Sequence, residues 1–91
     1  MSQSFGEYLQ QLRKAKGFTA ASLGLELNVH PTYISRLEQD RGGVPTPEKL
    51  REIAAALDCS FIGMMIKAGH ITEAEALGWI GEQQAKSHPS D

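Results

Sequence analysis

Apolar residues recur along most of this chain at spacings of three and four positions, the period of amphipathic helices. The first stripe joins Phe5, Tyr8, Leu9 and Leu12 and predicts a helix over residues 5–16. A serine suited to the N-cap precedes this stretch, and a glycine suited to a helix end follows it. The sequence therefore indicates both ends of the first helix.

Two shorter apolar stripes follow, separated by only a few residues. They predict one helix over residues 20–27 and another over residues 31–39. At the junction, Asn28 is of a type that adopts the left-handed conformation at helix ends, and Pro31 suits the first turn of a helix. Gly24 predicts the close approach of another helix, since a glycine inside a helix otherwise costs about 1 kcal/mol. Two short helices joined by a tight turn are the layout of a DNA-binding helix-turn-helix.

The second half of the chain carries three further helix patterns. We expect helices over residues 47–57, 61–68 and 73–85, each preceded by a serine or threonine that caps it. Because we find no strand pattern, the predicted fold class is all-α. The helix over residues 61–68 is apolar around most of its circumference, which indicates burial on more than one side. Its apolar residues are Phe61, Ile62, Met64, Met65 and Ile66.

Composition restricts the class of protein. The 91 residues are enough for one small domain. No apolar run approaches the roughly 20 residues of a membrane span, and the N-terminus lacks the features of a signal peptide. We therefore expect a cytoplasmic protein without membrane association. The net charge is −2, with a small basic excess confined to residues 1–44, so charge neither supports nor excludes DNA as a partner.

The residues that carry catalytic or metal chemistry are scattered. His30, His70, His88 and Cys59 fall in different segments, with none of the spacings that bind zinc. We find neither a glycine-rich phosphate loop nor a nucleophile elbow. We therefore expect no enzymatic activity, no metal site and no cofactor.

Several segments match one family at its own spacings: LRKAKGFT, SLGLELNV and HPTYISRLE, then a proline seven residues after Glu38, then EKLREIAAALDC. Together they resemble the Cro/C1-type helix-turn-helix regulators, the group of phage lambda repressor, Cro and the Xre-like bacterial repressors. The resemblance implies a lambda-repressor-like DNA-binding domain of five helices over residues 1–69. We expect residues 70–86 to hold a sixth, C-terminal helix that mediates dimerisation, and residues 87–91 to be a disordered tail.

The resemblance also implies which residues contact DNA. Phosphate contacts fall at the start of the second helix and on the loop after the third, and base contacts fall on the third helix, in the major groove. His30 is included as a phosphate or base contact, and its alternative role is a plain N-cap. The expected DNA-binding residues are Thr19, His30, Pro31, Thr32, Tyr33, Arg36, Arg41 and Gly43.

Arg36 is the residue that we expect to read a base. Its guanidinium matches O6 and N7 of guanine with two parallel hydrogen bonds, worth about 1–3 kcal/mol of discrimination. The alternative is an ordinary exposed arginine. Thr32 offers its methyl group to thymine or its hydroxyl to phosphate. Tyr33 either reaches phosphate or packs against the end of the first helix.

Two further groups of residues are expected to hold the molecule and its dimer together. The resemblance implies an ion pair between Arg13 and Glu38, and the alternative is two separate surface charges. The methionines and the tryptophan of the last two helices indicate a dimer interface, because such residues are enriched at interfaces. The alternative is that the sixth helix simply packs on the fifth. The expected interface residues are Met64, Met65, Leu77, Trp79 and Ile80.

These observations lead to one main functional prediction. We expect a sequence-specific transcriptional regulator, most simply a repressor, that binds double-stranded DNA at a palindromic operator as a homodimer. One alternative is an antitoxin or other protein-interaction module of the same fold, with a toxin or anti-repressor as its partner. A second alternative is a restriction-modification controller protein.

Overall fold

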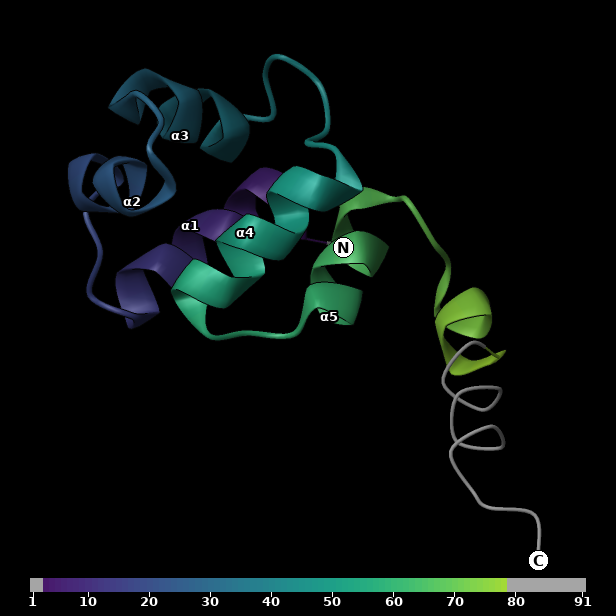
Figure 1. Cartoon of the computed structure of the whole chain (residues 1–91). Helices are drawn as coiled ribbons and strands as arrows, with labels where there is room; N and C mark the ends of the chain where they lie inside the picture. The colour runs from purple at the N-terminus through teal and green to yellow at the C-terminus, as the bar shows by residue number, and fades with distance from the viewer. Residues whose placement is uncertain (1–2, 79–91) are drawn as a thin grey trace, which may run out of the picture.

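The computed structural model describes residues 3–78, and all the regular secondary structure in this range is helical (Figure 1). The helices lie within one residue of the predicted bounds, and residues 73–78 are also helical, so the all-α fold class is confirmed. The remainder of the predicted sixth helix and the predicted tail lie outside the described residues. The helices are α1 (Phe5–Ala15), α2 (Ala20–Leu27), α3 (Pro31–Glu38), α4 (Pro47–Leu57) and α5 (Phe61–Ala68).

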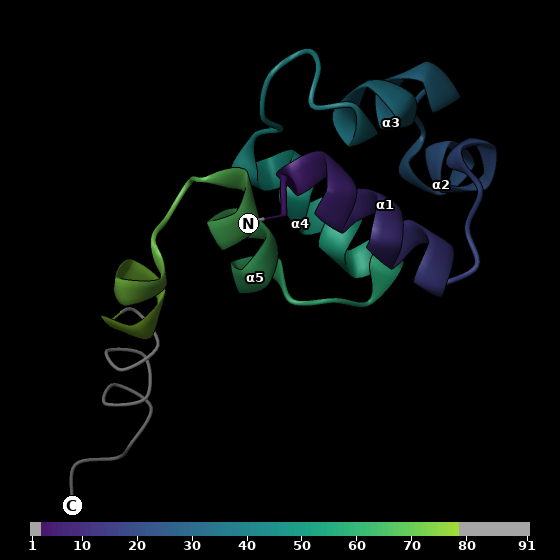
Figure 2. The same cartoon turned by 180° about the vertical axis from the view of Figure 1, so that it is seen from behind.

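Helices α1 and α4 connect the two ends of the fold. Helix α1 packs against α3 and α5, and α4 packs against α2 and α5. The pair α2 and α3, which also pack against each other, lies at one end of the molecule, and residues 73–78 project from the other (Figures 1 and 2). The helix-turn-helix is therefore separated from the C-terminal segment by the body of the domain.

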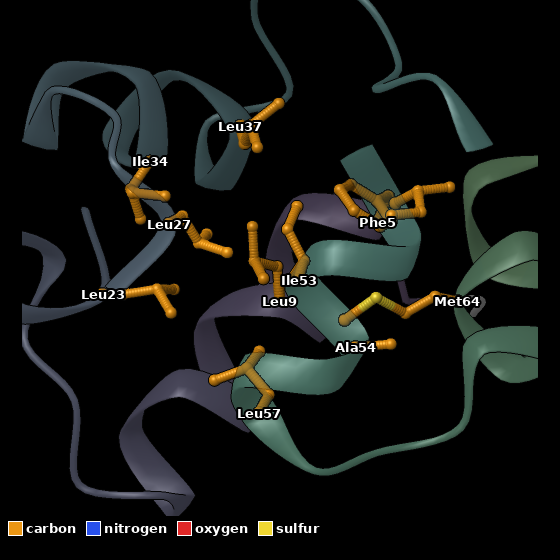
Figure 3. Packing of buried hydrophobic residues seen from close by; sticks show 11 residues of the cluster. Phe5, Leu9, Leu23, Leu27, Ile34, Leu37, Ile53, Ala54, Leu57 and Met64 are labelled. Atoms are coloured by element: carbon orange, nitrogen blue, oxygen red, sulfur yellow. The ribbon is translucent and has the colours of Figure 1, made fainter. Parts of the chain in front are cut away.

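The hydrophobic core draws side chains from all five helices (Figure 3). Leu9, Leu23, Ile34, Ile53 and Met64, one from each helix in turn, have no exposed surface. Burial of an aliphatic side chain of this size contributes about 1.5–3 kcal/mol. The apolar stripes found in the sequence are thus the faces that meet in the core.

The predicted helix ends are formed by local hydrogen bonds. Ser4 and Glu7 make a reciprocal capping box at the start of α1. Thr72 and Glu75 make another at the start of the helical residues 73–78. Asn28 adopts the left-handed conformation, with φ of 57°, at the end of α2. These local predictions are confirmed.

Helix α5 differs from its sequence prediction. Met64 is its one fully buried residue, while Phe61 and Met65 are half-buried against the core. Ile62 and Ile66 are also half-exposed and do not belong to the core cluster. Within residues 3–78, α1 and α4 therefore leave part of the apolar surface of α5 uncovered, and burial on a further side stays a prediction.

Candidate nucleic-acid interface

A close backbone approach fixes the angle between α2 and α3. A Cβ atom at Gly24 would lie 2.8 Å from the carbonyl oxygen of Val29 and 3.3 Å from the nitrogen of Pro31. The Val29 amide donates to the Gly24 carbonyl at 2.8 Å. The prediction that Gly24 permits a close approach is confirmed, but its neighbour is the turn and the first residue of α3 rather than a separate helix. The geometry of the turn therefore depends on a glycine at this position.

Two of the expected DNA contacts also cap helices. The Thr19 hydroxyl accepts from the Ser22 amide at 3.0 Å and so caps α2. His30 Nδ1 accepts from the Thr32 amide at 3.1 Å and caps α3, which is the alternative role considered for this residue. Both side chains are exposed. Capping holds the His30 ring at the start of α3 and leaves Nε2 as the nitrogen that can face a ligand.

The outer face of α3 is polar and exposed. Thr32 and Arg36 are four residues apart, on the face opposite to the buried Ile34 and Leu37. Within residues 3–78, no carboxylate lies within ion-pair distance of the Arg36 guanidinium. Arg36 therefore presents its hydrogen-bond donors to solvent from the last turn of α3, on its exposed face.

Tyr33 packs toward the loop between α3 and α4. It is half-buried and lines a hollow with Lys49 of α4 and with residues 42–46. Burial raises the pKa of the phenol, and the nearby Lys49 opposes this rise. The hydroxyl therefore keeps its proton at neutral pH and can donate a hydrogen bond. The expected packing was on the end of the first helix, whereas the hollow that Tyr33 lines is formed by this loop and Lys49, and the alternative contact with phosphate stays a prediction.

The loop after α3 exposes the Arg41 side chain next to the backbone of two glycines. Gly42 and Gly43 have φ angles of 80° and 86°, which side chains rarely adopt, and both are exposed. The Arg41 amide donates to the Arg36 carbonyl at 2.8 Å, so Arg41 follows directly from the end of α3. The first residues of this loop are thus fastened to α3 through the backbone.

A mostly buried ion pair connects three elements. Arg13 donates from Nε and Nη2 to the two carboxylate oxygens of Glu38, at 2.5 and 3.0 Å, and from Nη1 to the Phe18 carbonyl at 2.8 Å. The two charged side chains are only 11% and 7% exposed. The hydrogen bond to Glu38 raises the pKa of Arg13. The pair holds α1, the entry to α2 and the end of α3 in one arrangement.

Other contacts were not anticipated from the sequence. The Gly6 amide in the first turn of α1 donates to Asp40 Oδ1 at 2.8 Å. His70 Nε2 lies 2.7 Å from the Pro45 carbonyl and so joins the segment after α5 to the loop before α4. Lys49, beside Tyr33, is a further cation near α3.

The expected interface residues differ in their exposure. Leu77 is 71% exposed and Met65 is half-exposed. Met64 has no exposed surface, so it belongs to the core and is not available to a partner. Trp79 and Ile80 lie outside the described residues. A groove of about 480 Å³ runs beside α5, with Phe61, Ile62, Met65 and Ile71 among its lining residues.

The described residues offer little for other chemistry. Among residues 3–78, no three or more histidine, cysteine, aspartate or glutamate side chains are grouped to hold a metal ion. Burial raises the pKa of the Cys59 thiol, which keeps it protonated and poorly reactive. None of the helices in the described part of the chain is long and apolar enough to cross a membrane.

Comparison with known proteins gives matches over the same region. Residues 9–63 match the helix-turn-helix family HTH_3. The chain is 39% identical over 71 residues to the HTH-type transcriptional repressor RghR of Bacillus subtilis, covering 78% of this chain and 53% of that protein. It is 33% identical over 67 residues to the regulator RghRB of the same organism, covering 74% of this chain and 48% of that protein. The chain thus spans about half the length of these relatives.

Solved structures show the same fold. The P22 c2 repressor in complex with a synthetic operator superposes with a TM-score of 0.65 and 29% identity, over 72% of this chain and 98% of that one. The regulator SinR of Bacillus subtilis, in complex with DNA, gives 0.62 and 28%, over 67% and 97%. The restriction-modification controller protein C.AhdI of Aeromonas hydrophila gives 0.60 and 27%, over 66% and 89%. The fold described above is therefore lambda-repressor-like.

Proposed function

Because the chain belongs to the helix-turn-helix family HTH_3, in its Cro/C1-type group of transcriptional regulators, we propose that it is a repressor that binds a two-fold symmetric operator as a homodimer. In this proposal α3 enters the major groove. The relatives named above include a transcriptional repressor and two proteins solved in complex with DNA, which supports DNA as the ligand.

The observation that carries the proposal is the exposed polar face of α3. Arg36 projects from this face without an ion-pair partner among the described residues, so its two-pronged donor group is free to meet a guanine. Thr32 lies one turn earlier on the same face and reaches a neighbouring base or phosphate. We assign base reading to these two residues.

The phosphate contacts are proposed for the residues that flank this face. Thr19 lies at the N-terminus of α2, where backbone amides favour an anion. Arg41 follows α3, and Gly43 allows the backbone to approach a phosphate closely because it has no side chain. His30 and Tyr33 supply further donors from the start of α3. Such contacts set the register of α3 on the duplex.

The homodimer is proposed from the apolar surface at the opposite end of the fold. Leu77 and the half-exposed side of α5, including Met65, are apolar surface that a second copy would cover. A two-fold dimer would place its two α3 helices about 34 Å apart, one turn of DNA. Trp79 and Ile80 remain predicted members of this interface.

The proposal is tested with a duplex that the wild-type protein selects from a random pool, compared with a scrambled duplex of equal composition. Arg36→Ala is expected to weaken binding to the selected duplex about 5- to 150-fold, since one bidentate base contact is worth about 1–3 kcal/mol. Binding to the scrambled duplex should fall much less. Arg36→Lys keeps the charge but not the planar fork, so it should lose most of the same specificity.

Equal losses on both duplexes would show that Arg36 only contacts phosphate. A wild-type protein that selects no duplex at all would contradict the proposed function itself. An asymmetric selected sequence would contradict the two-fold operator.

A second candidate function is a restriction-modification controller, favoured by the similarity to C.AhdI. The DNA-binding surface would be the same, and only the regulated gene would differ. An endonuclease gene beside the gene for this chain would support this candidate, and its absence would favour the general repressor.

A further inference from the structure

Asp40 occupies a position that favours glycine. It follows α3 with φ of 56°, in the left-handed region. The Asp40 amide donates to the Leu37 carbonyl and the Arg41 amide to the Arg36 carbonyl, at 3.1 and 2.8 Å, which is the Schellman arrangement of a helix end. Residues other than glycine are uncommon there, although aspartate and asparagine are the side chains that tolerate this conformation best. An aspartate at this position is therefore expected to have a role for its side chain.

The side chain of Asp40 reaches a different helix. Its Oδ1 accepts a hydrogen bond from the Gly6 amide, 34 residues earlier, at 2.8 Å. This amide is one of the donors that the first turn of a helix leaves without a partner, and a carboxylate there also interacts favourably with the helix dipole. Asp40 thus ties the exit of α3 to the start of α1, a contact that glycine cannot make.

The backbones at this junction are already close together. A Cβ atom at Gly6 would collide with the Glu38 carbonyl group and would lie 2.8 Å from the Leu37 carbonyl oxygen. The last turn of α3 therefore rests directly on the first turn of α1. The Arg13–Glu38 pair fixes the same turn of α3 from the other end of α1.

We propose that Asp40 is a positioning residue for DNA binding, which holds Arg41 and the glycine loop at the edge of α3 by anchoring the helix exit to α1. The inference rests on the proposed function. The expected effect on DNA affinity runs against simple electrostatics, because Asp40 is an acidic residue adjacent to a proposed phosphate contact. As a free carboxylate it would repel phosphate, and its removal would strengthen binding. As an anchor it favours binding, and its removal would weaken the affinity for DNA.

The opposite signs make a direct test possible with the selected and scrambled duplexes described above. Asp40→Gly keeps the left-handed backbone and removes the anchor, so the variant is expected to fold. Asp40→Asn keeps an oxygen acceptor and tolerates the same backbone. The matched control is Asp58→Gly, which removes the same charge from a left-handed position, with φ of 51°, at the end of α4.

Asp40→Gly is expected to weaken binding to the selected duplex about tenfold, in line with the loss of a hydrogen bond to a charged group. The slope of log affinity against log salt should fall by about 0.9, one phosphate contact, as Arg41 loses its place. Asp40→Asn should retain most of the affinity and the slope. Asp58→Gly should match the wild type in both.

Binding by Asp40→Gly that equals or exceeds that of the wild type would overturn the inference, and so would an equal loss in Asp40→Asn. These results are read only where the wild-type protein binds its selected duplex. A failure of the wild type to bind any duplex is thus a distinct outcome that contradicts the proposed function. Thermal unfolding by circular dichroism confirms that each variant is folded at the temperature of the binding measurement.

Discussion

Helices α3 and α5 are both eight residues long and amphipathic, yet the rest of the chain holds them in different ways. Helix α3 is fixed by buried apolar side chains beneath it and by directional polar contacts at its C-terminal end, from Glu38 and Asp40 to α1. Helix α5 is held mainly through its buried Met64 and half-buried apolar neighbours, and its polar contacts are fewer: Arg51 lies over the Phe61 ring, and His70, just after the helix, contacts the Pro45 carbonyl. Apolar contacts alone fix an orientation less narrowly than hydrogen bonds of defined geometry.

The difference matches the two tasks proposed for these helices. A helix that reads bases must present a few polar groups at fixed positions, which favours anchoring at its ends. A helix that joins a second copy needs apolar surface left over after the chain has folded. Ile62 and Ile66 provide such surface on α5, whereas the exposed face of α3 carries Thr32 and Arg36. Three sets of substitutions test this contrast.

The largest effect is expected from the ion pair that anchors α3. Glu38→Ala should lower the free energy of unfolding by about 3–5 kcal/mol, since it strands the charge of Arg13 in a mostly buried site. The double variant Arg13→Met with Glu38→Leu should recover much of this loss, because no charge is then left buried. Urea denaturation followed by circular dichroism measures both. A loss below about 1 kcal/mol would place the pair with ordinary surface salt bridges and remove this part of the contrast.

A smaller effect on stability is expected from alanine substitutions of two glycines that lie inside helices, Gly24 in α2 of the helix-turn-helix and Gly63 in α5. Gly24→Ala should destabilise the fold by about 1–3 kcal/mol, because the new methyl group meets the backbone of the turn. Gly63→Ala in α5 is the matched control. The nearest atom to its new Cβ would be the Tyr8 hydroxyl at 3.4 Å, an ordinary contact. The gain in helix propensity, up to about 1 kcal/mol, should make this variant slightly more stable. Thermal melts that rank the two variants the other way would contradict the contrast.

The smallest effect concerns the apolar surface at the C-terminal end. Leu77→Glu should weaken self-association about tenfold, as expected when one apolar side chain loses its burial between copies. Leu25→Glu is the control, since Leu25 is 84% exposed but lies on α2, in the other region. Sedimentation equilibrium without DNA measures the dimer constant of each variant. If both leucines had the same effect, the proposed interface would be wrong.

The helices, their caps and most side chains of the core could be predicted from the sequence alone. Each of these features depends on residues within about four positions of one another, so the pattern carries the information directly. The stripe that contains Ile34 and Leu37 is buried, and Thr32 and Arg36 on the opposite face are exposed. The motif also predicted where to look for DNA contacts, and the resemblance to one family supplied the Arg13–Glu38 pair.

The contacts between segments that are far apart in the sequence became visible only in the tertiary structure. It brought Asp40 to the amide of Gly6 and turned Tyr33 toward the loop beside Lys49. It also placed Met64 in the core while leaving Leu77 exposed. Such contacts depend on the angles at which helices pack, and these angles are set by the whole set of interlocking side chains rather than by any one segment. The sequence therefore determined the parts of the DNA-binding unit, and the packing of α1 against α3 decided how those parts are held.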